Sequence, residues 1–181
     1  MEEKIKIIQG DITELDVDAI VNAANPRLLG GGGVDGAIHR AAGPELQEAC
    51  RAFGGCATGE ACLTLGFRLK AHFVIHTPGP VWQGGKYNEE ILLKRSYQNS
   101  LALAQKANCR SIAFPAISTG IYGFPKKKAS AIAFKSIASY CDENNYYPEI
   151  ILVAYSNQDH AILKVTHQNF LAWRRDVKNT L

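Results

Sequence analysis

The chain has 181 residues, of which 46% are hydrophobic and 20% charged, as expected for one soluble globular domain with a sizeable core. Its net charge of +3 is too small to indicate nucleic-acid binding, although it favours an anionic small molecule. No apolar run reaches the roughly 18–20 residues of a membrane helix, and the acidic start MEEKIKIIQGD is unlike a signal peptide. We therefore expect a cytoplasmic, monomeric protein with one domain over residues 1–181 and no membrane contact.

Short apolar runs alternate with helical patterns along the chain. The runs predict strands at Lys4–Ile8, Ala19–Asn22, Ala61–Leu65, Phe73–His76, Ser111–Pro115 and Ile150–Tyr155. Apolar residues at helical spacing predict helices at Val34–Phe53, Glu89–Asn108, Lys126–Asn144 and Gln158–Lys178. Strands that alternate with helices indicate an α/β domain with helices on both faces of a largely parallel sheet.

The segment Val21–Gly36, VNAANPRLLGGGGVDG, combines side-chain amides, a four-glycine run and a carboxylate. A glycine run that opens a helix points free N–H groups at an anion, which predicts a phosphate site beside Asn22, Asn25 and Asp35. A second glycine-rich turn, Ser118–Phe124, follows another buried strand. Ligands of open α/β sheets bind outside the carboxyl ends of strands, so both loops could line one crevice.

Neither of two known phosphate-binding motifs accounts for this segment. Gly31–Gly36 formally matches the GxGxxG pattern of dinucleotide-binding folds. That pattern belongs to the first strand–turn–helix unit, whereas this loop follows the second strand, and Glu60 begins a strand instead of ending one. A Walker loop is excluded because the chain contains no GK[ST].

Each polar residue has a structural alternative to a functional role. Asp35 is either a helix-capping carboxylate or a general base beside a phosphate. Asn25, before a proline, could simply stabilise a turn. Asp11, three residues before Glu14, resembles a helix N-cap, and the alternative is a carboxylate that accepts from a base amino group. We expect one of these roles to dominate at Asp11.

The remaining aromatic, basic and sulfur-containing residues give weaker signals. His39 is expected to be packed or hydrogen-bonded, and Lys126–Lys128 to be a solvated helix start. Tyr122 and Phe124 are interpreted as exposed loop aromatics that cover a sugar or base. The five cysteines, odd in number and without a CxxC pair, predict reduced thiols and argue against a zinc ribbon. We expect no metal, because His72 and His76 have no acidic ligands nearby. We also expect no cofactor.

Taken together, the motifs resemble those of a macrodomain, specifically the MacroD-type ADP-ribosyl hydrolases and O-acetyl-ADP-ribose deacetylases. The resemblance covers most of the chain, in the order of the family. It is carried by Gly10–Thr13, Val21–Asn25, Gly30–Gly43 (GGGGVDGAIHRAAG), His76–Trp82 and Phe114–Phe124 (FPAISTGIYGF). It implies a three-layer α/β/α sandwich around a mixed, mostly parallel sheet.

The resemblance also implies where ADP-ribose would lie. Adenine would lie near Asp11 and Ile12, with Tyr155 as a further aromatic contact, and the distal ribose would meet the two catalytic candidates, Asn25 and Asp35. The diphosphate would lie between the two glycine loops. The expected substrate contacts are Asp11, Ile12, Asn22, Gly32, Gly33, Val34, Gly36, Ser118, Thr119, Gly120, Ile121, Tyr122, Phe124 and Tyr155.

The single prominent carboxylate limits the reaction that we expect. An ADP-ribose ester of an acidic side chain expels a carboxylate, whose conjugate acid has a pKa of about 4, so no general acid is needed. We therefore expect hydrolysis of O-acetyl-ADP-ribose, of mono-ADP-ribosylated proteins, or of both, with water positioned by Asp35 and a substrate phosphate. The alternatives are a non-catalytic ADP-ribose reader and an RNA- or protein-binding regulator. The regulator would need a basic face with interleaved aromatics, of which the sequence offers only the lysine run.

Overall fold

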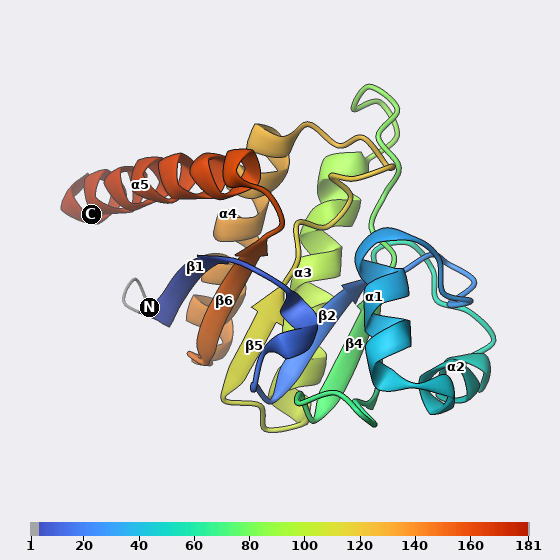
Figure 1. Cartoon of the computed structure of the whole chain (residues 1–181). Helices are drawn as coiled ribbons and strands as arrows, with labels where there is room; N and C mark the ends of the chain where they lie inside the picture. The colour runs from blue at the N-terminus through green and yellow to red at the C-terminus, as the bar shows by residue number, and fades with distance from the viewer. Residues whose placement is uncertain (1–3, 181) are drawn as a thin grey trace.

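The computed structural model describes residues 4–180, and its centre is a six-stranded sheet (Figure 1). The spatial order is β1-β6-β5-β2-β4-β3, with β3 antiparallel to β4 and every other pair parallel. The strands are β1 (Ile5–Gln9), β2 (Ala19–Ala23), β3 (Cys62–Leu65), β4 (Phe73–Thr77), β5 (Ser111–Phe114) and β6 (Glu149–Ala154). The sheet is mixed and mostly parallel, as expected, and each predicted strand is present within one residue of its predicted bounds.

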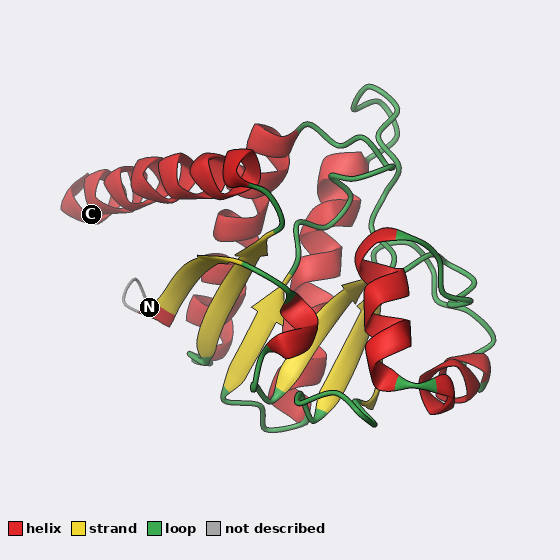
Figure 2. Cartoon of the chain, in the orientation of Figure 1, coloured by secondary structure: helices red, strands yellow, loops and turns green. Residues whose placement is uncertain are grey.

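Helices cover both faces of the sheet and complete a three-layer sandwich (Figure 2). They are α1 (Gly33–Ala42), α2 (Pro44–Arg51), α3 (Glu89–Lys106), α4 (Lys126–Asn144) and α5 (Asn157–Thr180), with a short 3-10 helix at Ile12–Glu14. Alternate residues of β2 enter different cores, because successive strand side chains point to opposite faces. Ile20 packs with α1 and α2, whereas Val21 packs with α3, α4 and α5. The predicted α/β/α architecture is therefore confirmed.

The prediction of one helix over Val34–Phe53 is wrong, because the structure divides this segment into α1 and α2. Gly43 lies between them with φ of +88°, a left-handed conformation that glycine adopts without steric cost. Pro44 then begins α2, where its missing N–H costs no helical hydrogen bond. The Gly-Pro pair therefore turns the chain between two helices.

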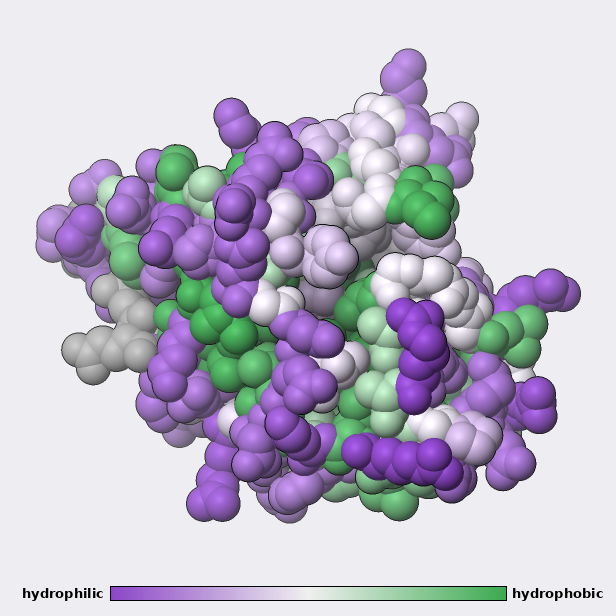
Figure 3. All heavy atoms as spheres, in the orientation of Figure 1, coloured by the Kyte–Doolittle hydropathy of each residue, from purple (hydrophilic) through white to green (hydrophobic). Residues whose placement is uncertain are grey.

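None of the helices within residues 4–180 combines the length and apolar character needed to cross a membrane. All five cysteines are free thiols, and four of them are buried. In Figure 3, residues of intermediate hydropathy gather at the upper right, where Figure 1 shows the loop after β5 above the start of α1.

Candidate functional site

Four segments that carry predicted site residues lie along one edge of the sheet. Strands β1, β6, β5 and β2 are parallel neighbours, so their carboxyl ends meet at that edge (Figure 1). Asp11 follows β1, Tyr155 follows β6, the loop with Ser118–Phe124 follows β5, and the first glycine loop follows β2. The two glycine loops therefore follow adjacent strands, which is the arrangement that a shared crevice needs.

The first glycine loop leads directly into α1. Gly31, Gly32 and Gly33 are exposed, and Gly32 is the N-cap without any side-chain cap for the helix. The N–H groups of the first turn can therefore bind an anion, which the helix dipole also attracts. A Cβ atom at Gly32 would meet no atom within 4 Å, so the space in front of these groups is open.

Gly36 lets α1 approach this loop closely. A Cβ atom at Gly36 would overlap the carbonyl oxygen of Gly31 and lie 3.0 Å from the guanidinium of Arg40. The backbone N–H of Gly36 donates to the carbonyl of Gly32 at 3.2 Å. The role of Gly36 is therefore to fit the loop against the helix, which supports the predicted phosphate site from behind.

The second glycine loop is tight and presents its backbone outward. The N–H of Phe124 donates to the carbonyl of Ser118 at 3.0 Å, and Ile121 at the tip is 97% exposed. Within the described residues, the N–H groups of Gly120, Ile121 and Tyr122 make no hydrogen bond to protein, and neither does the buried hydroxyl of Ser118. These unused donors, together with the neighbouring Thr119, which bonds back to Ala116, form a second possible anion site.

Asp35 is the buried carboxylate of the site, and its two oxygens differ. Oδ1 accepts from Nδ2 of Asn22 at 2.8 Å and lies 3.4 Å from Nε2 of His39. Oδ2 has no hydrogen-bond partner among the described residues. It faces the loop, because a Cβ atom at Gly31 would lie 3.4 Å from this oxygen and 3.8 Å from Nδ2 of Asn25. The structure thus brings Asp35 and Asn25 together around Gly31, and His39 lies partly buried beside Oδ1 of Asp35.

The side chain of Asn25 stabilises the segment that leads into the first glycine loop. Its Nδ2 donates to the carbonyl of Gly30 at 3.0 Å, and its Oδ1 accepts from the N–H of Leu29 at 3.3 Å. The turn-stabilising alternative for Asn25 is therefore present in the structure. Each end of the amide retains hydrogen-bonding capacity for a ligand, because the nitrogen carries a second proton and the oxygen a second lone pair.

Asn22 has a different place from the one predicted for it. It is fully buried, and it donates to Asp35 and, at 3.1 Å, to Nδ1 of His76. The expectation that Asn22 contacts substrate is wrong in this structure, since the side chain has no exposed surface. His76 in turn lies 3.0 Å, through Nε2, from the hydroxyl of Thr64, which donates to the carbonyl of Leu65 at 3.1 Å.

Phe124 is also not the exposed aromatic that the sequence predicts. It is 1% exposed, and its ring centroid lies 4.7 Å from that of Trp82. The N–H of Trp82 donates to the carbonyl of Tyr122 at 2.8 Å. Phe124 and Trp82 therefore anchor the second glycine loop from below, whereas Tyr122 is only half-buried.

The residues near the end of β1 and β6 lie at the other end of the edge. Asp11 is exposed and caps the 3-10 helix, because its Oδ1 accepts from the N–H of Thr13 at 2.9 Å and from the hydroxyl of Thr13 at 2.7 Å. The predicted cap is confirmed, and Oδ2 of Asp11 is left for a ligand. Ile12 is buried, Val34 is half-buried, and Tyr155 is 91% exposed.

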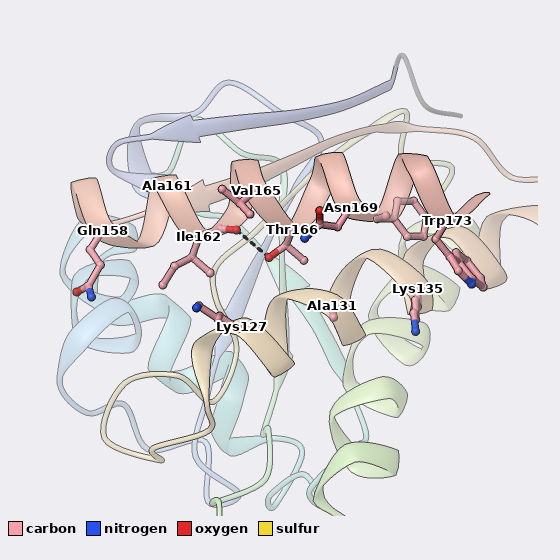
Figure 4. Close-up of a pocket in the computed structure, with 11 residues that line it drawn as sticks. Lys127, Ala131, Lys135, Gln158, Ala161, Ile162, Val165, Thr166, Asn169 and Trp173 are labelled. Carbon is pink, nitrogen blue, oxygen red and sulfur yellow. Dashed lines mark hydrogen bonds between the residues drawn. The ribbon is translucent and has the colours of Figure 1, made fainter. Parts of the chain in front are cut away.

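Two cavities lie outside this edge. One of about 450 Å³ is on the outer side of the first glycine loop, lined among others by Gly30, His39 and Arg40. Another of about 700 Å³ lies between α4 and α5, with Lys127, Lys135 and Trp173 among its lining residues (Figure 4). Neither of these two cavities is lined by both glycine loops.

Sequence reasoning missed His76, Thr64 and Trp82 as parts of the site. The segment His76–Trp82 contributes to the family resemblance, but no role in the site was predicted for His76 beyond the rejected one of metal ligand. The signal that could have found it is a polar residue on a strand next to the one that carries Asn22. That adjacency depends on the strand order, which becomes visible only in the fold.

Comparisons with known proteins show which proteins the chain is similar to. The family model described as the Macro domain matches residues 21–133. A Macro domain-containing protein of Chlorobaculum tepidum is 58% identical over 155 residues, covering 86% of this chain and 90% of the relative. A protein of Escherichia fergusonii named O-acetyl-ADP-ribose deacetylase is 53% identical, covering 88% and 92%. The solved Oceanobacillus iheyensis macrodomain with ADP has a TM-score of 0.86 and 43% identity, covering 91% of this chain and 90% of that one.

Proposed function

The chain belongs to the macrodomain family, and from this premise we propose that it binds ADP-ribose and hydrolyses ester-linked derivatives of ADP-ribose. The substrates would be O-acetyl-ADP-ribose, proteins that carry mono-ADP-ribose on acidic side chains, or both. The observation that carries the proposal is the arrangement of Asp35: Asn22 anchors one carboxylate oxygen, and the other faces Gly31 of the glycine loop without a hydrogen-bond partner among the described residues.

The order of segments along the sheet edge supports the orientation of the ligand. Asp11 and Tyr155 lie at the end formed by β1 and β6, where adenine would bind. The loop after β5 and the start of α1 follow, and together they offer free backbone N–H groups to a diphosphate. Asn25 and Asp35 lie on the same segment after β2, beside these N–H groups, so the distal ribose would meet them there.

The reaction needs one base and a positioned water. Oδ2 of Asp35 would accept a proton from a water that the substrate phosphate also holds. For an ester at the anomeric carbon, the water oxygen then bonds to that carbon, while the bond from the carbon to the acyl oxygen breaks and releases a carboxylate. For an acetyl group on another ribose hydroxyl, the water oxygen bonds to the acetyl carbonyl carbon, and the ribose oxygen leaves as a hydroxyl with the proton that Asp35 accepted from the water, so that acetate is released. Asn25 would fix the ribose, and the two glycine loops would hold the diphosphate. The substrate would therefore already be oriented for the reaction when it binds, which lowers the entropic part of the barrier.

A binding and turnover experiment tests this proposal. Calorimetry with ADP-ribose in the presence of a chelator should show a single site, and the protein should release ADP-ribose from O-acetyl-ADP-ribose and from mono-ADP-ribosylated protein. Comparing the two rates ranks the substrates. Absence of binding at millimolar ADP-ribose would remove the proposal altogether.

A double variant separates binding from catalysis. Asn25→Ala with Asp35→Ala should lower the hydrolysis rate by about 10²–10⁴, the usual effect of losing a positioned base, while much of the ADP-ribose affinity remains. Near wild-type hydrolysis in a variant that still binds ADP-ribose would place activation of the water elsewhere, most directly on the substrate phosphate.

Two alternative functions would give different results in the binding and hydrolysis experiments. A non-catalytic reader would bind ADP-ribose and leave both esters intact, and the paired Asn25 and Asp35 favour an enzyme over it. An RNA- or protein-binding regulator would need a free basic face, but Lys126 pairs with Asp159 and Lys128 pairs with Glu90, each at 2.6 Å. A cytoplasmic location and a monomeric state stay predictions.

A further inference from the structure

A line of polar side chains runs through an otherwise apolar layer beneath Asp35. Asn22 on β2 and His76 on β4 are direct partners in the parallel register, and Thr64 lies on β3, the next strand along. All three are buried, and they lie among the apolar residues that pack against α1 and α2. Polar groups placed so deeply cost folding free energy unless they are hydrogen-bonded, so their mutual contacts matter.

The charge on Asp35 determines how the protons of this line are arranged. A carboxylate only accepts hydrogen bonds, so the amide nitrogen of Asn22 must face Oδ1 of Asp35. The second N–H of the same amide points at Nδ1 of His76, which must then be the unprotonated nitrogen. Nε2 of His76 consequently carries the proton and donates to the hydroxyl of Thr64, whose own proton goes to the carbonyl of Leu65.

The surroundings of His76 keep the imidazole in this neutral form. Burial and, to a lesser extent, the neighbouring His39 on α1 lower the pKa of His76 to about 4, and Asp35 opposes them only in part. Cys50 on α2 lies 3.7 Å from Nε2, and burial together with Asp35 raises the pKa of its thiol to about 11, so the thiol is neutral as well. The charged groups that shift the pKa of His76 are His39 and Asp35, and neither lies on β3, β4 or α2.

One polar atom among Asn22, His76 and Thr64 has no hydrogen-bond partner in the described structure, and its position indicates the role of these three residues. Oδ1 of Asn22 is buried without a hydrogen-bond partner in the described structure. Rotating the amide by half a turn would aim this oxygen at the Asp35 carboxylate, which would repel it, and would remove the donor from Nδ1 of His76. Asn22 therefore keeps an orientation that serves its two neighbours at the expense of its own carbonyl oxygen.

We propose that His76, held by Thr64, is a positioning residue for the reaction: it orients the Asn22 amide, and the amide anchors Oδ1 of Asp35 so that Oδ2 stays directed at the substrate. The role in the reaction rests on the proposed function, in which Asp35 positions the water. The geometric part, that an Nε2–H imidazole fixes Asn22, stands on the hydrogen bonds alone. A histidine that only fills the core would not need a defined tautomer.

Three variants test the role in catalysis. His76→Phe keeps a buried ring and removes both nitrogens, and it should lower kcat about 10²-fold with little change in the Kd for ADP-ribose, because displacement of a reacting group by about 1 Å costs that much. His76→Asn places a side-chain oxygen where Nδ1 accepts from Asn22, so it should recover a large part of kcat. Val74→Ala is the matched control, since Val74 is buried in the same layer two residues earlier on β4 and takes no part in the line.

A spectroscopic measurement tests the geometric part without activity. The ¹⁵N spectrum of the wild-type protein with labelled histidine should show His76 neutral at pH 7, with the proton on Nε2 and none on Nδ1. The Asn22 side-chain amide should show two protons that exchange slowly with solvent. In His76→Phe at least one of these protons should exchange faster.

The outcomes distinguish the two proposals. An imidazolium or an Nδ1–H tautomer for His76 would overturn the inference, and so would wild-type kcat in a folded His76→Phe variant. An equal loss of kcat in Val74→Ala at equal loss of Tm would also overturn it, because the effect would then be general destabilisation. If the wild-type protein hydrolyses neither ester while His76 has the expected tautomer, the proposed function fails and the geometric part of the inference is supported.

Discussion

At the scale of single residues, the carboxylates of the site are held by only one of their two oxygens. Oδ1 of Asp35 accepts from Asn22, and Oδ1 of Asp11 accepts from Thr13, and in both cases Oδ2 is left without a protein partner in the described structure. A carboxylate can accept about four hydrogen bonds, so anchoring one oxygen fixes its orientation without exhausting it. Asp11 therefore caps a helix and keeps Oδ2 available, so that the predicted ligand contact stays compatible with the cap.

Asp11 provides a test of this double role. Asp11→Ala removes the cap and the charge, so the free energy of unfolding should fall by about 1 kcal/mol. ADP-ribose binding should weaken by a further 1.5–3 kcal/mol or so if Oδ2 accepts from the adenine amino group. Asp11→Ser is the matched variant, because serine also caps helices but carries no charge. Calorimetry should show that it retains the wild-type Tm and still loses affinity, whereas ribose 5-phosphate binds both variants as it binds the wild type.

His76 predicts a loss of stability in weak acid. Its ordinary pKa of 6.5 applies to the unfolded chain, and burial lowers the pKa to about 4 in the folded protein. As the pH falls below 6.5, the unfolded chain gains a proton that the folded protein does not, so folding becomes less favourable. The loss should reach about 3 kcal/mol near pH 4 and then level off. Urea unfolding of wild type and His76→Asn from pH 7 to pH 4 checks this, and equal slopes for the two proteins would contradict it.

At the scale of elements, the strands and most helices could be predicted because their patterns are local. Lys126–Asn144 was predicted with its observed bounds, since its apolar residues recur at helical spacing. The division at Gly43 was missed although Gly-Pro is a strong break signal, because the apolar periodicity continues across it. The burial of Asn22 and Phe124 could not be predicted, since it depends on which strand or loop lies beside each.

The contact between α1 and the first glycine loop gives a prediction for these elements. Gly36→Ala would place a methyl group on the carbonyl of Gly31, so either the helix or the loop must move. We expect a loss of about 1–3 kcal/mol in the free energy of unfolding, as for other overpacked sites. ADP-ribose affinity should fall as well, because the loop presents its N–H groups to the diphosphate. Gly32→Ala is the control for stability alone, since a Cβ atom there meets no protein atom within 4 Å and the φ of −90° suits alanine.

At the scale of the whole molecule, the proposed site and the larger cavity occupy different regions. The cavity follows α5 as far as Trp173, which lies about 22 Å along the helix from Gln158 at a rise of 1.5 Å per residue. Figure 1 shows α5 extending away from the sheet edge toward the C-terminus. The distance from the proposed ligand therefore increases along α5 from Gln158 toward Trp173.

This separation predicts that the far part of the cavity is independent of ligand binding. Trp173→Ser should leave the Kd for ADP-ribose and the rate of ester hydrolysis unchanged. Trp173 is half exposed, and Nζ of Lys135 lies over its ring, 5.2 Å from the centroid. Because such an exposed cation–π contact contributes little to stability, we expect only a small change of Tm. A several-fold change in Kd would show that α5 and the sheet edge are coupled.

The pairing of the first strand with the last constrains how the protein is made. Ile5 pairs with Ile150, so β1 has no partner until almost the entire chain has left the ribosome. At a synthesis rate of about 5–20 residues per second, β1 must wait on the order of ten seconds. Over that time β5, β2 and β4 can already assemble, because their pairing needs no later segment. Asp11 and Tyr155 are therefore brought together last, and a nascent or truncated chain that ends before β6 would carry both glycine loops but only half of the binding edge.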